Sequence, residues 1–176
     1  MIFGNQTGAT GLTTNAEATI TGAIYKCPAN SFIGVLTVYI NCTVSAKNMK
    51  CAIYRFSDLK LLGSTNQLSI PVSAAWRSFQ FPTPQPLLVG GTDYILCVWS
   101  AAGTGLANVT YSAGSVNQGQ QMALAYDGWP DPLVPSATNN YAYSIYAICL
   151  LTGIQKLTVG TSRKLWARNL LDSGIG

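Results

Sequence analysis

The side chains that could do chemistry in this chain lack the usual catalytic combinations. Its 176 residues include no histidine, which excludes a Ser-His-Asp triad, a Cys-His pair, a histidine base and histidine-ligated zinc. A glycosidase needs two carboxylates that face each other across a cleft. Of the six acidic residues, only Asp127 and Asp131 are close in sequence, within the turn-like segment 127–132. Because aspartate is common in turns for its own backbone hydrogen bonds, we expect no enzyme activity.

The five cysteines match neither a zinc site nor a redox pair, because no C-x-x-C spacing is present. Most of them lie inside apolar runs, so we expect mainly buried free thiols that act as small hydrophobic side chains. One or two disulfides are the alternative, and Cys42 and Cys51 are the best candidates for a pair. The odd number leaves at least one thiol unpaired within the chain. The cysteines are Cys27, Cys42, Cys51, Cys97 and Cys149.

Two kinds of binding are compatible with the polar and aromatic residues of the last third of the chain. Sugars stack on exposed aromatic rings while amides and carboxylates bind their hydroxyls; the alternative is that these rings pack into the core. A structural calcium ion would use Asp127 and Asp131, with Asp58 as a further ligand, although no D-x-D-x-D spacing is present. No other cofactor is expected. The candidate glycan-binding residues are Tyr126, Asp127, Trp129, Asn139, Asn140, Tyr141 and Tyr143.

Charged residues are scarce. They make up 9% of the chain, where an average soluble domain has about 25%. Hydrophobic residues make up 48%, which together with the small net charge of +4 excludes a disordered chain. Ten lysines and arginines are too few for tight binding to nucleic acid, so we expect no such partner. Low surface charge and a positive mean hydropathy favour association with other subunits.

The hydrophobic pattern is that of β-strands throughout residues 1–151. Apolar residues alternate in Ile33–Cys42, which is typical of a half-buried strand. The segment Tyr94–Trp99 is apolar at every position and predicts a central strand covered on both faces. The segment Tyr141–Leu151 predicts one last long strand, and Ser45–Asn48 a turn. Turn signals every 8–12 residues predict an all-β, antiparallel jelly-roll β-sandwich of about eight to ten strands.

The order of motifs along residues 2–150 supports the same fold. It resembles a broad group of jelly-roll β-sandwich modules in microbial surface proteins and virion structural proteins, which are similar to carbohydrate-binding modules. The resemblance implies a jelly roll and, for some members, glycan recognition. The motifs that carry it are Phe32–Ile40, Cys51–Asp58, Trp76–Phe81, Leu88–Trp99, Asp127–Leu133 and Asn140–Ala147.

Residues 152–176 lie outside this resemblance and form a second segment of different composition. Apolar residues, among them Leu165, Leu170 and Leu171, stand between basic ones. An apolar segment containing a tryptophan is unfavourable in water, so it should dock on its own body or on a neighbour. We expect a C-terminal arm that docks on a neighbouring subunit. The residues expected to act in this arm are Lys156, Arg163, Lys164, Trp166 and Arg168.

The expected function is therefore a non-catalytic structural or adhesive subunit of a larger extracellular assembly. A virus particle is the most economical version, with the chain as a capsid, decoration, spike or fibre protein that forms homo-oligomers or joins other structural subunits. The alternative is a carbohydrate-binding module that recognises surface glycans. The first residues lack the pattern of a signal peptide. Apolar runs are shorter than the ~18 residues of a membrane helix, so we expect a virion or extracellular location without membrane insertion.

Three asparagines begin N-x-Thr sequons, at Asn5, Asn41 and Asn108. These would carry sugar only if the chain passes through a glycosylating secretory system.

Overall fold

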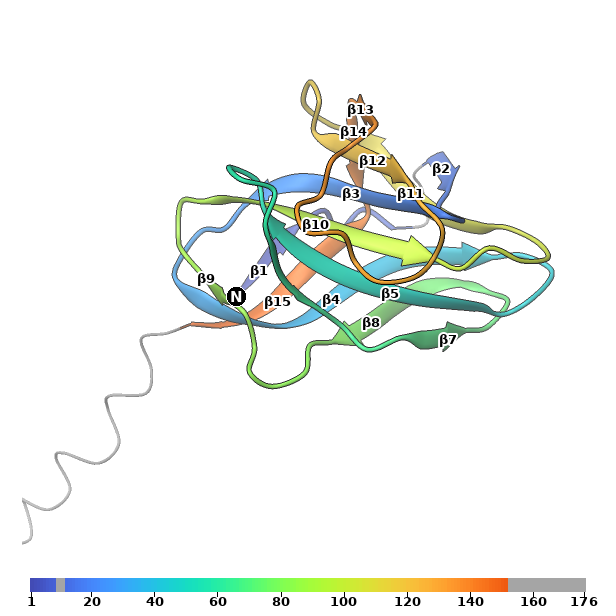
Figure 1. The fold of residues 1–176 in the computed structure, drawn as a ribbon, viewed down its shortest axis with the longest axis horizontal. Helices are drawn as coiled ribbons and strands as arrows, with labels where there is room; N and C mark the ends of the chain where they lie inside the picture. The colour runs from blue at the N-terminus through green and yellow to red at the C-terminus, as the bar shows by residue number, and fades with distance from the viewer. Residues whose placement is uncertain (9–11, 152–176) are drawn as a thin grey trace, which may run out of the picture.

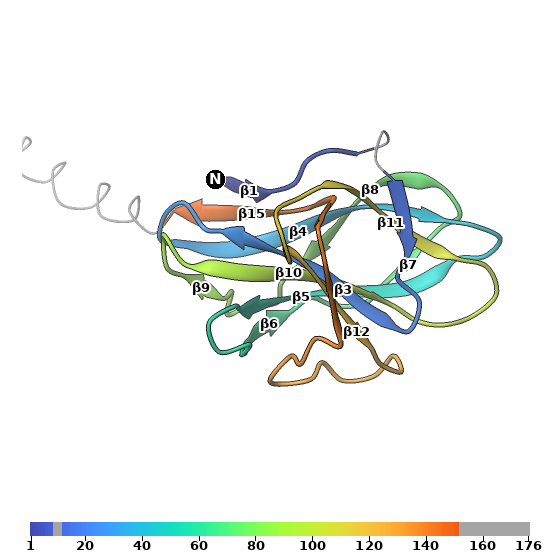
Figure 2. The same ribbon diagram turned by 90° about the horizontal axis from the view of Figure 1, so that it is seen from above.

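The computed structural model describes residues 1–8 and 12–151, which form two antiparallel β-sheets packed face to face (Figures 1 and 2). No helix occurs in these residues. The eight-stranded sheet contains β1 (Ile2–Gly4), β2 (Leu12–Asn15), β4 (Ser31–Cys42), β8 (Ala74–Gln80), β9 (Leu87–Leu88), β11 (Ala107–Ala113), β14 (Tyr141–Tyr143) and β15 (Ile145–Leu151). The seven-stranded sheet contains β3 (Thr19–Lys26), β5 (Lys47–Arg55), β6 (Leu61–Ser64), β7 (Leu68–Ile70), β10 (Asp93–Ser100), β12 (Gly119–Ala123) and β13 (Ala137–Asn139).

The expected all-β antiparallel sandwich is confirmed. Eight of the fifteen strands in the described residues have five or more residues, and the other seven are short strands of two to four residues. The long strands alternate between the sheets along the chain: β3 and β5 belong to one sheet, and β4 between them belongs to the other. The same alternation continues from β8 through β10, β11 and β12 to β15. Each sheet is therefore built from strands that are distant in sequence.

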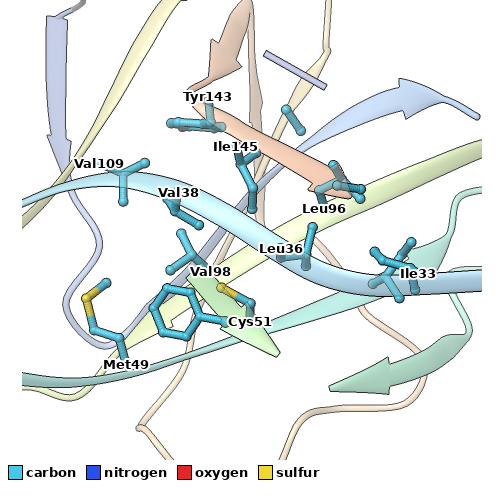
Figure 3. Close-up of a cluster of buried hydrophobic side chains, with 14 of the residues drawn as sticks. Ile33, Leu36, Val38, Met49, Cys51, Leu96, Val98, Val109, Tyr143 and Ile145 are labelled. Atoms are coloured by element: carbon cyan, nitrogen blue, oxygen red, sulfur yellow. The ribbon is translucent and has the colours of Figure 1, made fainter. Parts of the chain in front are cut away.

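Strand β4 organises the eight-stranded sheet, where it pairs with β8, β9, β11 and β15. Its predicted alternation is confirmed, because Leu36, Val38, Ile40 and Cys42 are all 1% exposed or less. These side chains lie in one cluster with Leu96 and Val98 of the opposite sheet. Figure 3 shows Leu36 and Val38 of β4 close to Leu96 and Val98.

Strand β10 lies inside the seven-stranded sheet between β3 and β5, and both of its faces are covered, as its sequence predicts. Leu96 and Val98 face the other sheet and belong to the main core. The alternate residues Ile95, Cys97 and Trp99 face outward and form a second core under the segment between β12 and β13. This outer core exists because β10 is apolar on both faces and would otherwise present Trp99 to water.

Two boundaries differ from the sequence expectation. The segment 141–151 is not one strand: it is interrupted at Ser144, where the chain changes from β14, paired with β11, to β15, paired with β4. The Ser144 N–H donates to the Thr110 carbonyl at 2.8 Å, and the Ser144 carbonyl accepts from the Tyr39 N–H at 2.9 Å. The turn expected at 45–48 is also wrong in part, because β5 begins at Lys47.

All five cysteines are buried free thiols, as the apolar runs around them predict. The alternative disulfide between Cys42 and Cys51 is therefore wrong. In the described part of the chain, no helix has the length and apolarity needed to cross a membrane. The predicted arm, with Lys156, Arg163, Lys164, Trp166 and Arg168, lies outside the described residues.

Candidate functional site

The first candidate site is an aromatic cluster on the outer face of the seven-stranded sheet. Strands β5 and β10 place Lys50 directly opposite Trp99, and the segment between β12 and β13 adds Tyr126 and Trp129. The Lys50 ammonium nitrogen lies 4.6 Å from the centroid of the Trp99 ring, 4.5 Å from that of Tyr126 and 5.5 Å from that of Trp129. It also donates to the backbone carbonyl of Asp127. A cation over several ring faces is a stabilising arrangement.

The three rings also pack against one another. The Trp99 centroid lies 5.3 Å from that of Tyr126 and 5.2 Å from that of Trp129. Trp99 is fully buried, whereas Tyr126 and Trp129 are half-buried. Burial raises the pKa of Tyr126 to about 12, and its hydroxyl donates to Gln67 Oε1 at 3.0 Å. Burial also lowers the pKa of Lys50, while the nearby Asp127 acts in the opposite direction.

The predicted glycan-binding residues divide between two clusters. Tyr126, Asp127 and Trp129 come together around Lys50, and Asp127 is exposed beside the two rings. The other predicted residues lie on β13, β14 and the link between them. There Tyr141 stacks on Tyr111, with 3.8 Å between ring centroids.

In this second cluster the polar groups have partners within the protein. Asn139 Nδ2 donates to the Tyr143 hydroxyl at 2.9 Å, and Asn140 Oδ1 accepts from the Asn117 N–H at 3.0 Å. Tyr143 is fully buried. The arrangement ties β13 and β14 to the neighbouring turn.

The candidate calcium ligands take part in loop contacts. Asp58 accepts from Arg55 Nε at 2.9 Å, and this ion pair lowers the pKa of Asp58 to about 2. Asp131 Oδ1 accepts from the Leu61 N–H at 3.0 Å. Across residues 1–8 and 12–151, no group of three His, Cys, Asp or Glu side chains is placed to hold a metal ion. A calcium site at Asp127 and Asp131 stays a prediction.

An exposed apolar surface is the feature that the sequence reasoning missed. Leu87 of β9, Phe32 of β4 and Leu150 of β15 are register partners and therefore share one face across three strands. They are 57%, 41% and 66% exposed, and Ile2 and Ile148 continue the row on β1 and β15. We call these five residues the β15 surface. Figure 1 shows β9, β15 and the N-terminus together at this end of the sandwich.

Two hollows adjoin the β15 surface. The first, of about 270 Å³, lies beside Ile148 and Leu150 and continues to Gly34 and Phe81. The second, of about 390 Å³, includes Phe32, Leu87 and Val89. Since Phe32 and Leu150 are opposite each other in the sheet, the hollows lie next to one another. No charged side chain lines either of them.

No protein-family model matches the chain, and a search of curated proteins finds no matching relative.

Proposed function

We propose that this protein is a non-catalytic structural subunit of a larger extracellular assembly. The observation that carries the proposal is the β15 surface, where Leu87, Phe32 and Leu150 stand exposed in one register row. Contiguous exposed apolar patches mark interaction sites, because leaving them in water is unfavourable. A virus particle is the most economical assembly, in which the chain would be a capsid, decoration, spike or fibre protein.

The distribution of charge supports the same proposal. Residues 1–151 contain six basic and five acidic side chains. In the described structure, the pairs Lys26–Asp93, Lys47–Glu17 and Arg55–Asp58 occupy six of these eleven. A surface with so few unpaired charges provides little repulsion between copies and favours association.

The carbohydrate-binding alternative is supported by the half-buried rings of Tyr126 and Trp129 beside the exposed Asp127. Against it, the Lys50 ammonium already lies over both rings, where a sugar would stack. Assembly therefore has the stronger support.

The proposal is tested on the full chain by size-exclusion chromatography with light scattering over a wide range of concentration. We expect a discrete multiple of the 18.7 kDa chain mass, and ordered rings, filaments or particles by electron microscopy. A chain that stays monomeric at every concentration would overturn the assembly function.

A further inference from the structure

We propose that the β15 surface is the docking site for residues 152–176 of a second copy of this chain. The inference rests on the proposed assembly function and specifies which surface and which segment join the copies.

The chemistry of the surface selects an apolar occupant. Phe32, Leu87 and Leu150 project from one face, and the two hollows that they help to line have no charged side chain in their lining. The polar side chains at their edges are uncharged amides, those of Asn30, Gln80 and Gln85. A charged ligand would lose its hydration here without gaining a counter-charge. Leucine and tryptophan side chains would instead cover the surface at no such cost.

Residues 152–176 supply these side chains. Leu165 and Trp166 form one apolar pair, and Leu170 and Leu171 form a second one five residues later. The number of apolar pairs matches the number of adjacent hollows. Burying these large apolar side chains favours docking, because it removes their surface from water.

The exit point and the length of the segment allow it to reach another copy. Leu151 pairs with Ser31 at the margin of the β15 surface, so the segment begins beside its own docking site. Leu165 comes fourteen positions after Leu151, and this length of chain can extend over roughly 45–50 Å. That distance exceeds the radius of gyration of a domain of this size, roughly 15 Å. If the segment docked on its own copy, it would cover the β15 surface without joining two copies. Because the proposed function requires the copies to associate, we infer that the segment docks on a second copy.

The test is a complementation experiment with two full-length variants. The first, Leu87→Asn with Leu150→Asn, has a disabled surface and an intact segment. The second, Leu165→Ser with Trp166→Ser, has an intact surface and a disabled segment. We expect each variant alone to have the 18.7 kDa mass of a monomer. An equal mixture should form a one-to-one dimer, because one functional segment then meets one functional surface.

The matched control is Val116→Asn, which removes an even more exposed apolar side chain (79%) outside the β15 surface. It should keep the wild-type mass. Circular dichroism checks that each variant is folded, and Leu150→Gln alone replaces the double surface variant if that variant does not fold.

Three other results would contradict the docking inference. If the wild type oligomerises and the mixture stays monomeric, the segment does not act between copies. If either variant keeps the wild-type mass, the copies join elsewhere. Both results overturn the docking inference and leave the assembly function standing. A monomeric wild type overturns both.

Discussion

The ammonium nitrogen of Lys50 lies 4.6 Å from the ring centroid of Trp99, its register partner on β10. The same nitrogen lies over Tyr126 and Trp129 and donates to the Asp127 carbonyl. The Lys50 side chain of β5 therefore holds the segment between β12 and β13 in contact with the outer core. This segment has no regular secondary structure before β13, so its position depends on such contacts.

Replacing Lys50 by methionine should lower the free energy of unfolding by about 1–2 kcal/mol, because the cation–π contacts and the hydrogen bond are lost. Methionine keeps an unbranched apolar side chain, so the change isolates the loss of the cation. Urea denaturation followed by tryptophan fluorescence provides the measurement. Lys50→Arg is the control and should keep most of the stability, since its guanidinium also stacks on rings. Equal stability of Lys50→Met and the wild type would contradict a fastening role.

The ion pair of Glu17 and Lys47 is a second connection between distant segments, and it is nearly enclosed: the side chains are 14% and 3% exposed. Glu17→Gln should cost about 3 kcal/mol of unfolding free energy, because the buried Lys47 ammonium loses its counter-charge. The double variant Glu17→Gln with Lys47→Met should recover much of this loss. Guanidinium denaturation midpoints provide the measurement.

The exposed pair of Arg55 and Asp58 supplies the control for this experiment, since exposed pairs contribute little. Asp58→Asn should leave the midpoint nearly unchanged. If Asp58→Asn lowered the denaturation midpoint as much as Glu17→Gln, burial would not determine how much these ion pairs stabilise the fold.

Local periodicity explains which parts of the fold could be predicted from the sequence. The alternation in Ile33–Cys42 and the continuous apolar run Tyr94–Trp99 are properties of single segments, and both match β4 and β10. The interruption at Ser144 has no such signal. It arises because the chain changes its pairing partner from β11 to β4, which is a tertiary event.

The candidate sites, too, could be predicted from the sequence only where their residues are neighbours in the chain. Tyr126, Asp127 and Trp129 could be grouped from sequence because they are neighbours in one loop. Lys50 could not be added, since it is more than seventy residues away and reaches them only through the pairing of β5 with β10. Leu87, Phe32 and Leu150 likewise come from three separate segments, and only strand register places them in one row.

The cysteine thiols should be unreactive in the native protein. All five are buried, and burial raises the pKa of Cys149 to about 11 and those of Cys51 and Cys97 well above the ordinary thiol value. Since the thiolate is the reactive form, Ellman's reagent in mildly alkaline buffer should react slowly with folded protein. It should detect five thiols after denaturation without reductant. Fewer than five would reveal a disulfide.

The Asp58 carboxyl group should titrate at about 2, because it accepts hydrogen bonds from Arg55. A carboxyl whose pKa is lower in the folded state stabilises the fold above its unfolded pKa. Because the pair with Arg55 is exposed, this contribution is small, and it is lost as the pH falls through about 2. Carboxyl-carbon NMR provides the measurement, and Arg55→Met should return the pKa toward its ordinary value of 3.8. An unchanged pKa in that variant would exclude Arg55 as the cause.

Substitutions at Trp129 can distinguish a packing role of this side chain from a role in glycan recognition, because a conservative substitution affects stability and glycan binding differently in the two cases. The centroid of its ring lies 5.2 Å from that of Trp99 and 6.2 Å from that of Tyr54. The Lys50 ammonium lies over the Trp129 ring. Trp129→Ala should therefore lower the unfolding free energy by about 2 kcal/mol, less than for a fully buried tryptophan because the side chain is half-buried.

Trp129→Phe should restore part of this stability, since phenylalanine keeps an aromatic face for Lys50. A glycan array at millimolar protein should show no binding that depends on position 129, because the ring faces are used inside the protein. The opposite result would be a glycan bound by the wild type and lost in Trp129→Phe while thermal stability is retained. It would assign the cluster to carbohydrate recognition, with Lys50 displaced from the rings by the sugar.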